Sequence, residues 1–279
     1  MPTIEFDQAK LANFEVGAGE TVVLLHSSAS SGAQWRSLCA SLADRFAALA
    51  PDLYGYGASD PWPGLAPMTL ADEVAPLAAL LARRPGPVHL VGHSYGGAVA
   101  LRLALQSPAR LRSLTLIEPV AFHLLRCGGA AQRALYDEVA ALADGVAAAL
   151  GSGAYWSAME RFVDYWNGAG AFGRMALEKR RDLGRRIGAV ALNFSAAMAE
   201  PVAPGACRRI RVPTLLLAGG ASPPTTRRIV ALVAQTLRHA REQVVAGAGH
   251  MLPLTHRDPV NAAIVEHLVR HAGRLRVAA

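Results

Sequence analysis

The stretch Leu90-Val91-Gly92-His93-Ser94-Tyr95-Gly96-Gly97 is an apolar run that ends in the pattern Gly-x-Ser-x-Gly. A serine hydroxyl becomes a nucleophile only when a base takes its proton and the backbone presents it to a substrate. A sharp strand-to-helix turn presents it in this way, and such a turn leaves no room for side chains two residues before and after the serine. Gly92 and Gly96 occupy those two positions. The pattern therefore predicts a nucleophilic serine between a strand and a helix.

The sequence on both sides of Ser94 supports this interpretation. An apolar strand pattern precedes it, and residues 98–105 (Ala-Val-Ala-Leu-Arg-Leu-Ala-Leu) have a helical composition. The first N–H groups of that helix would point at the reaction centre, where they can hold a developing oxyanion. The alternative is a Gly-rich turn with an incidental serine, and the strand and helix make it the weaker interpretation.

The composition is that of a globular protein with ample core material. The chain has 279 residues, of which 52% are hydrophobic and 18% are charged, enough for one large domain or for a domain with an inserted subdomain. The longest apolar runs are strand-sized, and residues 1–7 show neither a basic nor an apolar signal region. Cys39, Cys127 and Cys207 are widely spaced, so we expect buried thiols in a reducing compartment. A cytoplasmic location is the expectation.

The positive charge of the chain is dispersed. The formal net charge is +7, and it comes mainly from arginines that occur in separate pairs such as Arg83-Arg84 and Arg227-Arg228. A nucleic-acid-binding surface would combine clustered cations with interleaved aromatic residues on one module. We therefore expect no nucleic-acid partner and no membrane partner, and coding bias explains the arginines better than a polyanion does.

Apolar strand patterns alternate with helical patterns along most of the chain. Strands are expected at residues 21–26, 46–50, 87–91, 111–117, 212–218 and 242–245, and helices at 35–45, 70–84, 98–105, 226–237 and 258–271. Thr69 is the expected N-cap of the helix at 70–84, and residues 4–16 could form an edge hairpin. Continuous apolar strands between helices are typical of a mostly parallel sheet covered on both faces, so we predict an α/β fold.

This alternation stops between residues 119 and 211. That block contains helical stretches rich in alanine and aromatic residues and no buried strand pattern. A helical block inside an α/β sheet is best interpreted as a lid over the carboxyl ends of the strands. We therefore predict a core made of residues 1–118 and 212–279, and a helical cap made of residues 119–211.

Four motifs occur in an order that resembles the α/β-hydrolase superfamily, in its serine-nucleophile branch with an inserted helical cap. They are His26-Ser27-Ser28 at the end of the first core strand, the loop Asp52-Leu53-Tyr54-Gly55-Tyr56-Gly57-Ala58-Ser59, the turn Gly92-His93-Ser94-Tyr95-Gly96, and the segment Gly247-Ala248-Gly249-His250-Met251. The resemblance covers essentially the whole chain and implies an α/β-hydrolase fold. Ser27 stands where the family usually has glycine.

The chemistry and the resemblance together assign roles to these motifs. Ser94 is the expected nucleophile, and His250 is the expected general base, which later protonates the leaving group. The backbone N–H groups of Ser28 and Tyr95 are the expected oxyanion hole. We expect His26 to support the oxyanion loop through a hydrogen bond, and His93 to pack inside the turn. Asp52 is expected to organise its own loop.

The acid that orients His250 is harder to place. The family most often carries it after the strand that follows the cap, but residues 218–225 contain no carboxylate, and neither does any position between Glu200 and Glu242. A histidine base still needs an acceptor that fixes its tautomer. Glu118 ends the strand after the nucleophile helix, where some superfamily members place their acid, so Glu118 is our hypothesis. The alternatives are that Glu118 is a solvated strand-end acid and that Ser222 serves His250 directly or through a water.

These residues suit hydrolysis of an ester, thioester or lactone of a small, largely apolar substrate by a monomer or a homodimer. The open alternatives are a C–C bond hydrolase, a perhydrolase, a lyase or cofactor-free oxygenase, and a catalytically weakened ligand-binding protein. No metal-ligand or dinucleotide motif is present in the sequence, so no metal or cofactor is expected. The aromatic segment 155–166 could line the pocket or pack the cap onto the core. The basic segment 178–186 could attract a carboxylate, but a solvated basic face is favoured.

Overall fold

A computed structural model describes residues 3–273 and contains one eight-stranded sheet with the order β1-β2-β4-β3-β5-β6-β7-β8. The strands are β1 (Thr3–Phe6), β2 (Ala9–Val16), β3 (Glu20–Leu25), β4 (Phe46–Pro51), β5 (Val88–His93), β6 (Leu111–Ile117), β7 (Thr214–Gly219) and β8 (Ala240–Val245). β1 and β2 form the expected antiparallel hairpin at the edge, and β4, β3, β5, β6, β7 and β8 run parallel to one another. The predicted α/β-hydrolase sheet is confirmed.

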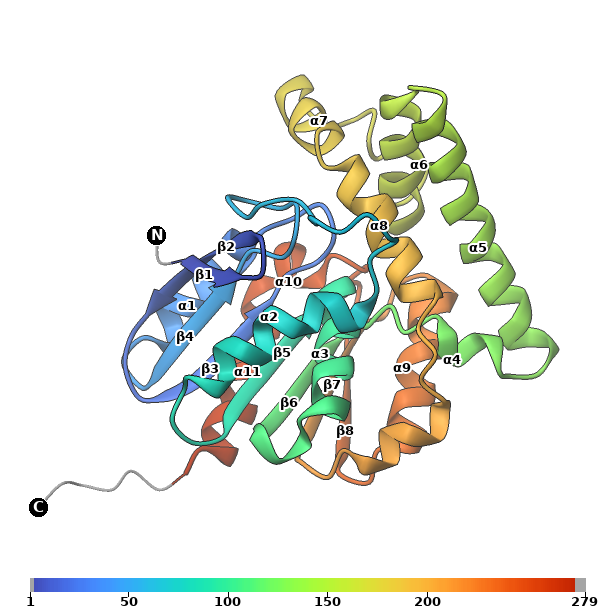
Figure 1. Ribbon diagram of the computed structural model, residues 1–279. Helices are drawn as coiled ribbons and strands as arrows, with labels where there is room; N and C mark the ends of the chain where they lie inside the picture. Colours follow the sequence, from blue (N-terminus) through green and yellow to red (C-terminus); the bar gives the residue numbers. More distant parts are fainter. Residues whose placement is uncertain (1–2, 274–279) are drawn as a thin grey trace, which may run out of the picture.

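Helices cover both faces of this sheet (Figure 1). One face carries α2 (Leu70–Ala82), α3 (Tyr95–Gln106) and α9 (Pro224–Thr236), and the other carries α1 (Arg36–Leu42) and α11 (Arg257–His271). Alternation along β3 explains the arrangement, because Val23 and Leu25 join the first hydrophobic core while Val22 and Leu24 join the second. Successive side chains of a strand point to opposite faces, so a strand that is apolar throughout needs a helical layer on each side.

The start of α2 follows the sequence signal. The Thr69 side chain accepts a hydrogen bond from the Asp72 N–H, and the Asp72 carboxylate accepts one from the Thr69 N–H. This reciprocal capping box satisfies two N–H groups that the first helical turn cannot satisfy itself. The helix therefore begins where the threonine predicts.

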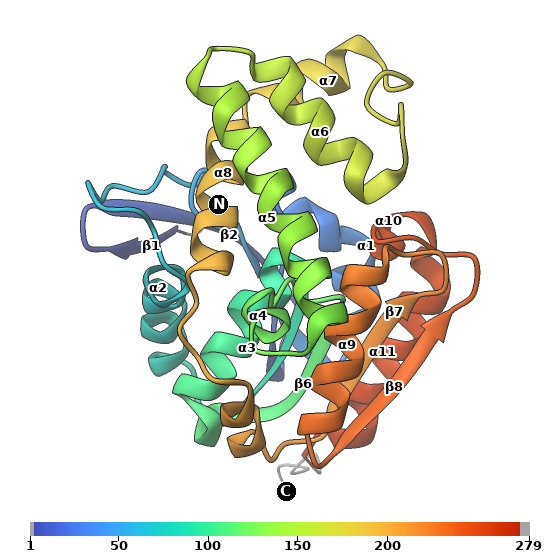
Figure 2. The same ribbon diagram turned by 90° about the vertical axis from the view of Figure 1, so that its right-hand side faces the viewer.

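A helical layer stands beyond the carboxyl ends of the central strands (Figure 1, Figure 2). It consists of α4 (His123–Arg126), α5 (Ala130–Gly151), α6 (Tyr155–Asn167), α7 (Leu177–Gly184) and α8 (Ile187–Met198), all between β6 and β7. α5 packs on α9 and α8 packs on α3, which joins this layer to the sheet's own helices. In residues 119–211 the regular elements are helices and one short 3₁₀ turn, Pro204–Arg209.

The turn between β5 and α3 is as tight as the two glycines predict. Ser94 has φ 55° and ψ −115°, a conformation that L-residues rarely adopt. A Cβ on Gly92 would overlap the carbonyl oxygen of Gly96, and a Cβ on Gly96 would overlap the carbonyl oxygens of Leu25 and His26. Backbone atoms cannot move aside cheaply, so glycine is required at both positions.

We expect Gly96→Ala to destabilise the fold by about 3 kcal/mol or more, because the added methyl group overlaps two carbonyl oxygens of β3 and the loop after it. Urea unfolding monitored by circular dichroism measures this change. The matched control is Gly188→Ala in α8, where a Cβ meets no atom within 4 Å and alanine favours the helix. Equal midpoints for the two variants would contradict the prediction.

One sequence expectation about the cysteines is wrong. Cys39 and Cys207 are buried, but Cys127 is exposed, because it follows the short helix α4 at a turn outside the core. Among residues 3–273, no helix combines the length and apolar character needed to cross a bilayer.

Candidate active site

A chain of two hydrogen bonds joins Ser94, His250 and Glu118, which come from three different parts of the sequence. The Ser94 hydroxyl lies 2.9 Å from Nε2 of His250. Nδ1–H of the same imidazole donates to Oε2 of Glu118 over 2.6 Å. Ser94 follows β5, Glu118 follows β6, and His250 lies in the loop after β8. The parallel sheet brings the carboxyl ends of its strands to one edge, and the three predicted residues meet there.

Glu118 is held in a strained and buried position. Its φ is 42° and its side chain is buried. The amide N–H of Gly219, the last residue of β7, donates to Oε1 of Glu118 over 2.7 Å. Burial raises the pKa of the Glu118 carboxyl, but its hydrogen bonds and the positive charge of His250 outweigh burial, and the net pKa lies below its usual value. The end of β7 carries no carboxylate of its own, and its Gly219 N–H donates a hydrogen bond to Glu118.

Ser222 does not replace Glu118 in this arrangement. Its hydroxyl is buried and near enough to Glu118 to help lower the pKa of that carboxyl, but it has no partner in residues 3–273 with the geometry of a full hydrogen bond. The imidazole Nδ1 already faces Glu118 Oε2, so the neutral hydroxyl has no open position on that ring. The solvated strand-end interpretation of Glu118 is wrong, because the side chain has no exposed surface.

Trp166 of α6 packs on the imidazole of His250. The ring centroids are 4.4 Å apart and the planes are inclined by 29°, a stacked geometry. The tryptophan covers one face of the ring and limits its movement away from Ser94. The sequence placed Trp166 in an aromatic segment but did not distinguish it from the other rings there.

His93 does more than pack inside the turn, which corrects the sequence expectation. Burial lowers the pKa of His93 to about 3, so the ring is neutral. Nε2–H donates to the carbonyl oxygen of His250 over 2.9 Å, and Nδ1 lies 3.1 Å from the amide nitrogen of Gln34. The amide oxygen of Gln34 accepts from the N–H and the hydroxyl of Ser27. Through Gln34 and His93, Ser27 therefore connects the loop after β3 to the backbone of His250. A glycine at this position would keep the N–H bond to Gln34 but would lack the hydroxyl bond.

Ser28 and Tyr95, the predicted oxyanion-hole residues, lie near Ser94. The three residues line one small cavity, and neither N–H has an acceptor within residues 3–273. The Ser28 hydroxyl donates to Oδ1 of Asn193 in α8 over 2.7 Å, and the Tyr56 hydroxyl donates to the same oxygen over 2.6 Å. An amide of the helical layer thus fixes the loop that carries the Ser28 N–H.

His26 and Asp52 support the loops as expected. His26 Nδ1–H donates to the carbonyl oxygen of Ser27, and its Nε2 accepts from the Leu53 N–H over 3.0 Å. Burial lowers the pKa of His26 to about 4, which keeps the ring neutral for this double contact. The Asp52 carboxylate accepts from the N–H groups of Gly32 and Ala58, so it closes its own loop.

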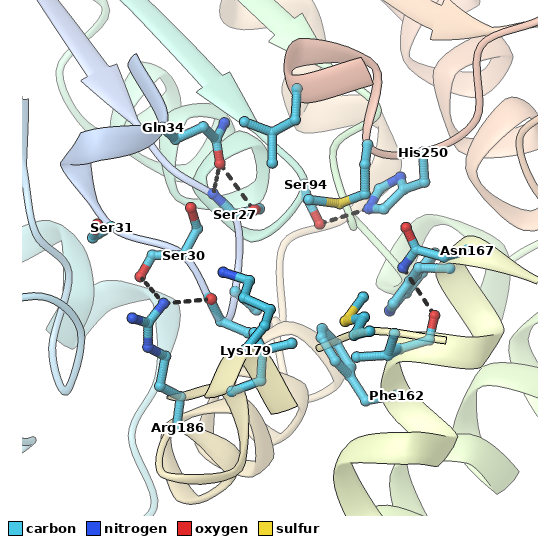
Figure 3. A pocket seen from close by; sticks show the side chains of 18 of the residues that line it. Ser27, Ser30, Ser31, Gln34, Ser94, Phe162, Asn167, Lys179, Arg186 and His250 are labelled. Carbon is cyan, nitrogen blue, oxygen red and sulfur yellow. Dashed lines mark hydrogen bonds between the residues drawn. The ribbon is translucent and has the colours of Figure 1, made fainter. Parts of the chain in front are cut away.

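A cavity of about 510 Å³ opens in front of Ser94 and His250 (Figure 3). The loop 27–31 and Gln34 form one wall. The helical layer and the segment after His250, which includes the short helix α10 (Leu252–Thr255), contribute apolar side chains, namely Phe162, Val163, Trp166, Met175, Leu183, Met251 and Leu254. Of the aromatic segment, Phe162 and Trp166 face this cavity, while Tyr155 and Trp156 are 53% and 45% exposed.

The basic segment 178–186 also departs from the expectation of a purely solvated face. Lys179 and Arg186 line the cavity, and Figure 3 shows both side chains reaching toward the loop of serines. Within residues 3–273, no group of three or more histidines, cysteines or acidic residues is arranged to hold a metal ion.

A buried carboxylate lies behind the turn. Glu73 of α2 accepts from the Tyr54 N–H over 3.1 Å and from the Tyr95 hydroxyl over 3.2 Å. Its side chain is 1% exposed, and burial raises its pKa to about 7. The folded state therefore binds a proton at Glu73 that the unfolded chain releases near pH 4.5.

This shift predicts a pH-dependent stability. Because the folded pKa is raised, stability from Glu73 is present below pH 4.5 and is lost as pH rises to about 7. The expected loss is about 3 kcal/mol. Glu73→Gln keeps a carbonyl acceptor but cannot ionise, so it should gain stability relative to the parent chain at pH 8 and not at pH 4.5. Urea unfolding at both pH values measures this, and parallel pH curves for the two proteins would refute the buried ionisation.

The sequence matches a known protein family over most of its length. The family model described as the alpha/beta hydrolase fold matches residues 20–257. The chain belongs to the α/β hydrolase fold family. Lipase LipV of Mycobacterium tuberculosis is 42% identical over 99 residues, which make up 35% of this chain and 36% of the lipase. The chain thus spans about a third of that curated relative.

Solved α/β hydrolases have the same architecture over almost the entire chain. The enol-lactonase from Burkholderia xenovorans LB400 matches with a TM-score of 0.78 at 19% identity, covering 96% of this chain and 100% of the other. A hydrolase from Pseudomonas aeruginosa PA01 matches with a TM-score of 0.72 at 26% identity, covering 95% and 96%. At such low identity the enol-lactonase shows the fold alone.

Proposed function

We propose that this α/β hydrolase is a serine hydrolase that cleaves the ester-type bond of a small, largely apolar substrate through an acyl-enzyme on Ser94. The ester-type bond is that of an ester, thioester or lactone. The hydrogen-bonded chain Ser94–His250–Glu118 carries the proposal, because a nucleophile, a base and an orienting carboxylate in series are what acyl transfer requires.

In the proposed first step, Ser94 Oγ attacks the substrate carbonyl carbon while its proton moves to Nε2 of His250. Glu118 holds the ring in the tautomer whose Nε2 is free to accept, and stabilises the imidazolium that forms. The carbonyl oxygen becomes an oxyanion and accepts hydrogen bonds from the N–H groups of Ser28 and Tyr95. Collapse of the intermediate breaks the bond to the leaving group, which takes the proton from His250.

In the proposed second step, a water molecule takes the place of Ser94 as the attacking nucleophile. His250 takes a proton from the water molecule as it attacks the acyl carbon, and the second tetrahedral intermediate expels Ser94 Oγ, which recovers a proton from the ring. The products are the free acid and the alcohol, or the hydroxy acid when the substrate is a lactone. The two steps use the same residues in the same positions.

The surroundings of the site support a small apolar substrate. We propose residues 119–211 as a cap over a core of residues 1–118 and 212–279, because α6 and α7 supply much of the apolar wall of the cavity. A volume of about 510 Å³ suits a small molecule. LipV carries the name of a lipase, which favours an ester-type bond here.

A fluorophosphonate probe and p-nitrophenyl acetate test the proposal. We expect the probe to modify Ser94, identified by peptide mass spectrometry, and the ester to give a burst of nitrophenolate followed by turnover. A C–C hydrolase would be labelled but would turn the ester over slowly. If Ser94 is not labelled and no burst is seen, the proposal is overturned, and the alternative of a ligand-binding protein is favoured.

A further inference from the structure

The rim of the cavity formed by α7 and the turn between α7 and α8 carries uncompensated positive charge. Arg186 donates two hydrogen bonds to Asp182, at 3.0 and 2.8 Å, and a third to the Ala29 carbonyl oxygen at 2.8 Å. Lys179 is 4.0 Å from the same Asp182 carboxylate. One carboxylate therefore faces two cations, and its stronger contacts are with Arg186. The positive charge of Lys179 is left largely unpaired.

No carboxylate offsets this charge inside the cavity. Among the described residues that line it, none is an aspartate or a glutamate. The Lys179 side chain, 57% exposed, extends from α7 into the cavity between Arg186 and Phe162, and Ser94 and His250 lie across the cavity from it (Figure 3). The cavity thus has a reacting end, an apolar wall and a cationic end.

The use of lysine here is unusual for this chain. Lys10 and Lys179 are its two lysines, within a total of 28 lysines and arginines. Arg186 acts as a planar fork that holds a carboxylate and a carbonyl, whereas a lysine ammonium on a flexible stem is a mobile point charge. A lysine ammonium can therefore contact a charged end of a substrate in more than one position, because it requires no fixed hydrogen-bond geometry.

We propose that Lys179 binds a carboxylate at the end of the substrate away from the scissile bond, so that the preferred substrates are half-esters or lactones bearing a free acid. The inference rests on the proposed function for its chemistry but not for its binding site. A single net positive charge matches a monoanion, which favours a carboxylate over a phosphate monoester.

Matched ester pairs test the proposal kinetically. The monomethyl esters of glutaric, adipic and suberic acid are compared with the dimethyl esters of the same acids. We expect the parent protein to prefer the monomethyl esters in kcat/KM, and Lys179→Met to lower this preference by about fivefold through KM, the range of a partly exposed ion pair. Lys179→Arg should keep most of the preference, and Lys10→Met, an exposed site on β2, is the matched control. Added salt should weaken the preference.

A second experiment does not depend on catalysis. With two lysines in the chain, acetylation by an amine-selective reagent followed by peptide mass spectrometry reports on Lys179, with Lys10 as the internal reference. We expect adipate to slow acetylation of Lys179 and not of Lys10, and neutral adipamide to protect neither. Inorganic phosphate serves as the competing anion.

The outcomes separate the two proposals. Equal acetylation of Lys179 with and without adipate, or an unchanged ester preference in Lys179→Met, would overturn the carboxylate site. Stronger protection by phosphate than by adipate would also overturn the carboxylate assignment. Protection of Lys179 by adipate in a protein that neither labels at Ser94 nor hydrolyses either ester would keep the anion site and remove the proposed chemistry.

Discussion

Ser94→Ala is expected to lower kcat for p-nitrophenyl esters by about a millionfold, to the residual rate that binding and the oxyanion donors provide. The methyl side chain cannot form the acyl-enzyme, so the two-step route is closed. The fold should remain, because alanine fits the space of the hydroxymethyl group and the turn itself depends on Gly92 and Gly96. Burst and steady-state kinetics on purified protein measure the loss, with circular dichroism confirming the fold.

A double variant sharpens this test. If Ser94 and His250 act as one unit, Ser94→Ala combined with His250→Ala should be about as slow as Ser94→Ala alone, because the second change removes a partner that no longer has a task. If the rate loss of the double variant equalled the product of the two single-variant losses, Ser94 and His250 would not act as one proton-transfer unit. Activity above about a hundredth of the parent rate in Ser94→Ala would contradict the nucleophile itself.

The parts of the site that the sequence predicts are those defined by local backbone rules. The turn at residues 92–96 requires two glycines at fixed spacing, so five residues suffice to indicate it. The sheet follows from apolar runs separated by helical patterns, since each run must be buried on both faces. Glu118 is predicted because the resemblance implies an acid at one of two strand ends, and no carboxylate occurs between Glu200 and Glu242, where the more usual of the two lies.

The parts that the sequence does not predict depend on contacts between distant segments. Gln34 joins Ser27 to His93, Asn193 holds Ser28 from α8, and Trp166 stacks on His250 from α6. The role of each depends on a partner that it meets only when the chain has folded and the helical layer lies over the sheet. Lys179 lies in a basic segment for which the sequence leaves a carboxylate partner as the less favoured alternative to a solvated face, and only the folded structure places its side chain at the cavity.

Glu118→Gln tests the least conventional member of the site, and we expect it to lower kcat by about ten-thousandfold. The Gly219 N–H must keep an acceptor, so the amide oxygen of the substituted side chain would take the place of Oε1 and its NH₂ group would face His250. A donor at that point forces the imidazole into the tautomer with a proton on Nε2. That nitrogen could then no longer accept the proton of Ser94.

The matched control for this substitution is Ser222→Ala, which removes the other group that sequence reasoning considered. We expect it to keep activity within about tenfold of the parent, because a neutral hydroxyl without a full hydrogen bond orients nothing. The rate of labelling by the fluorophosphonate should fall in Glu118→Gln and remain close to the parental rate in Ser222→Ala. Thermal unfolding reports whether each variant is folded. Near-parental turnover in Glu118→Gln, or a large loss in Ser222→Ala alone, would move the orienting role to Ser222 or leave Ser94 and His250 as a dyad.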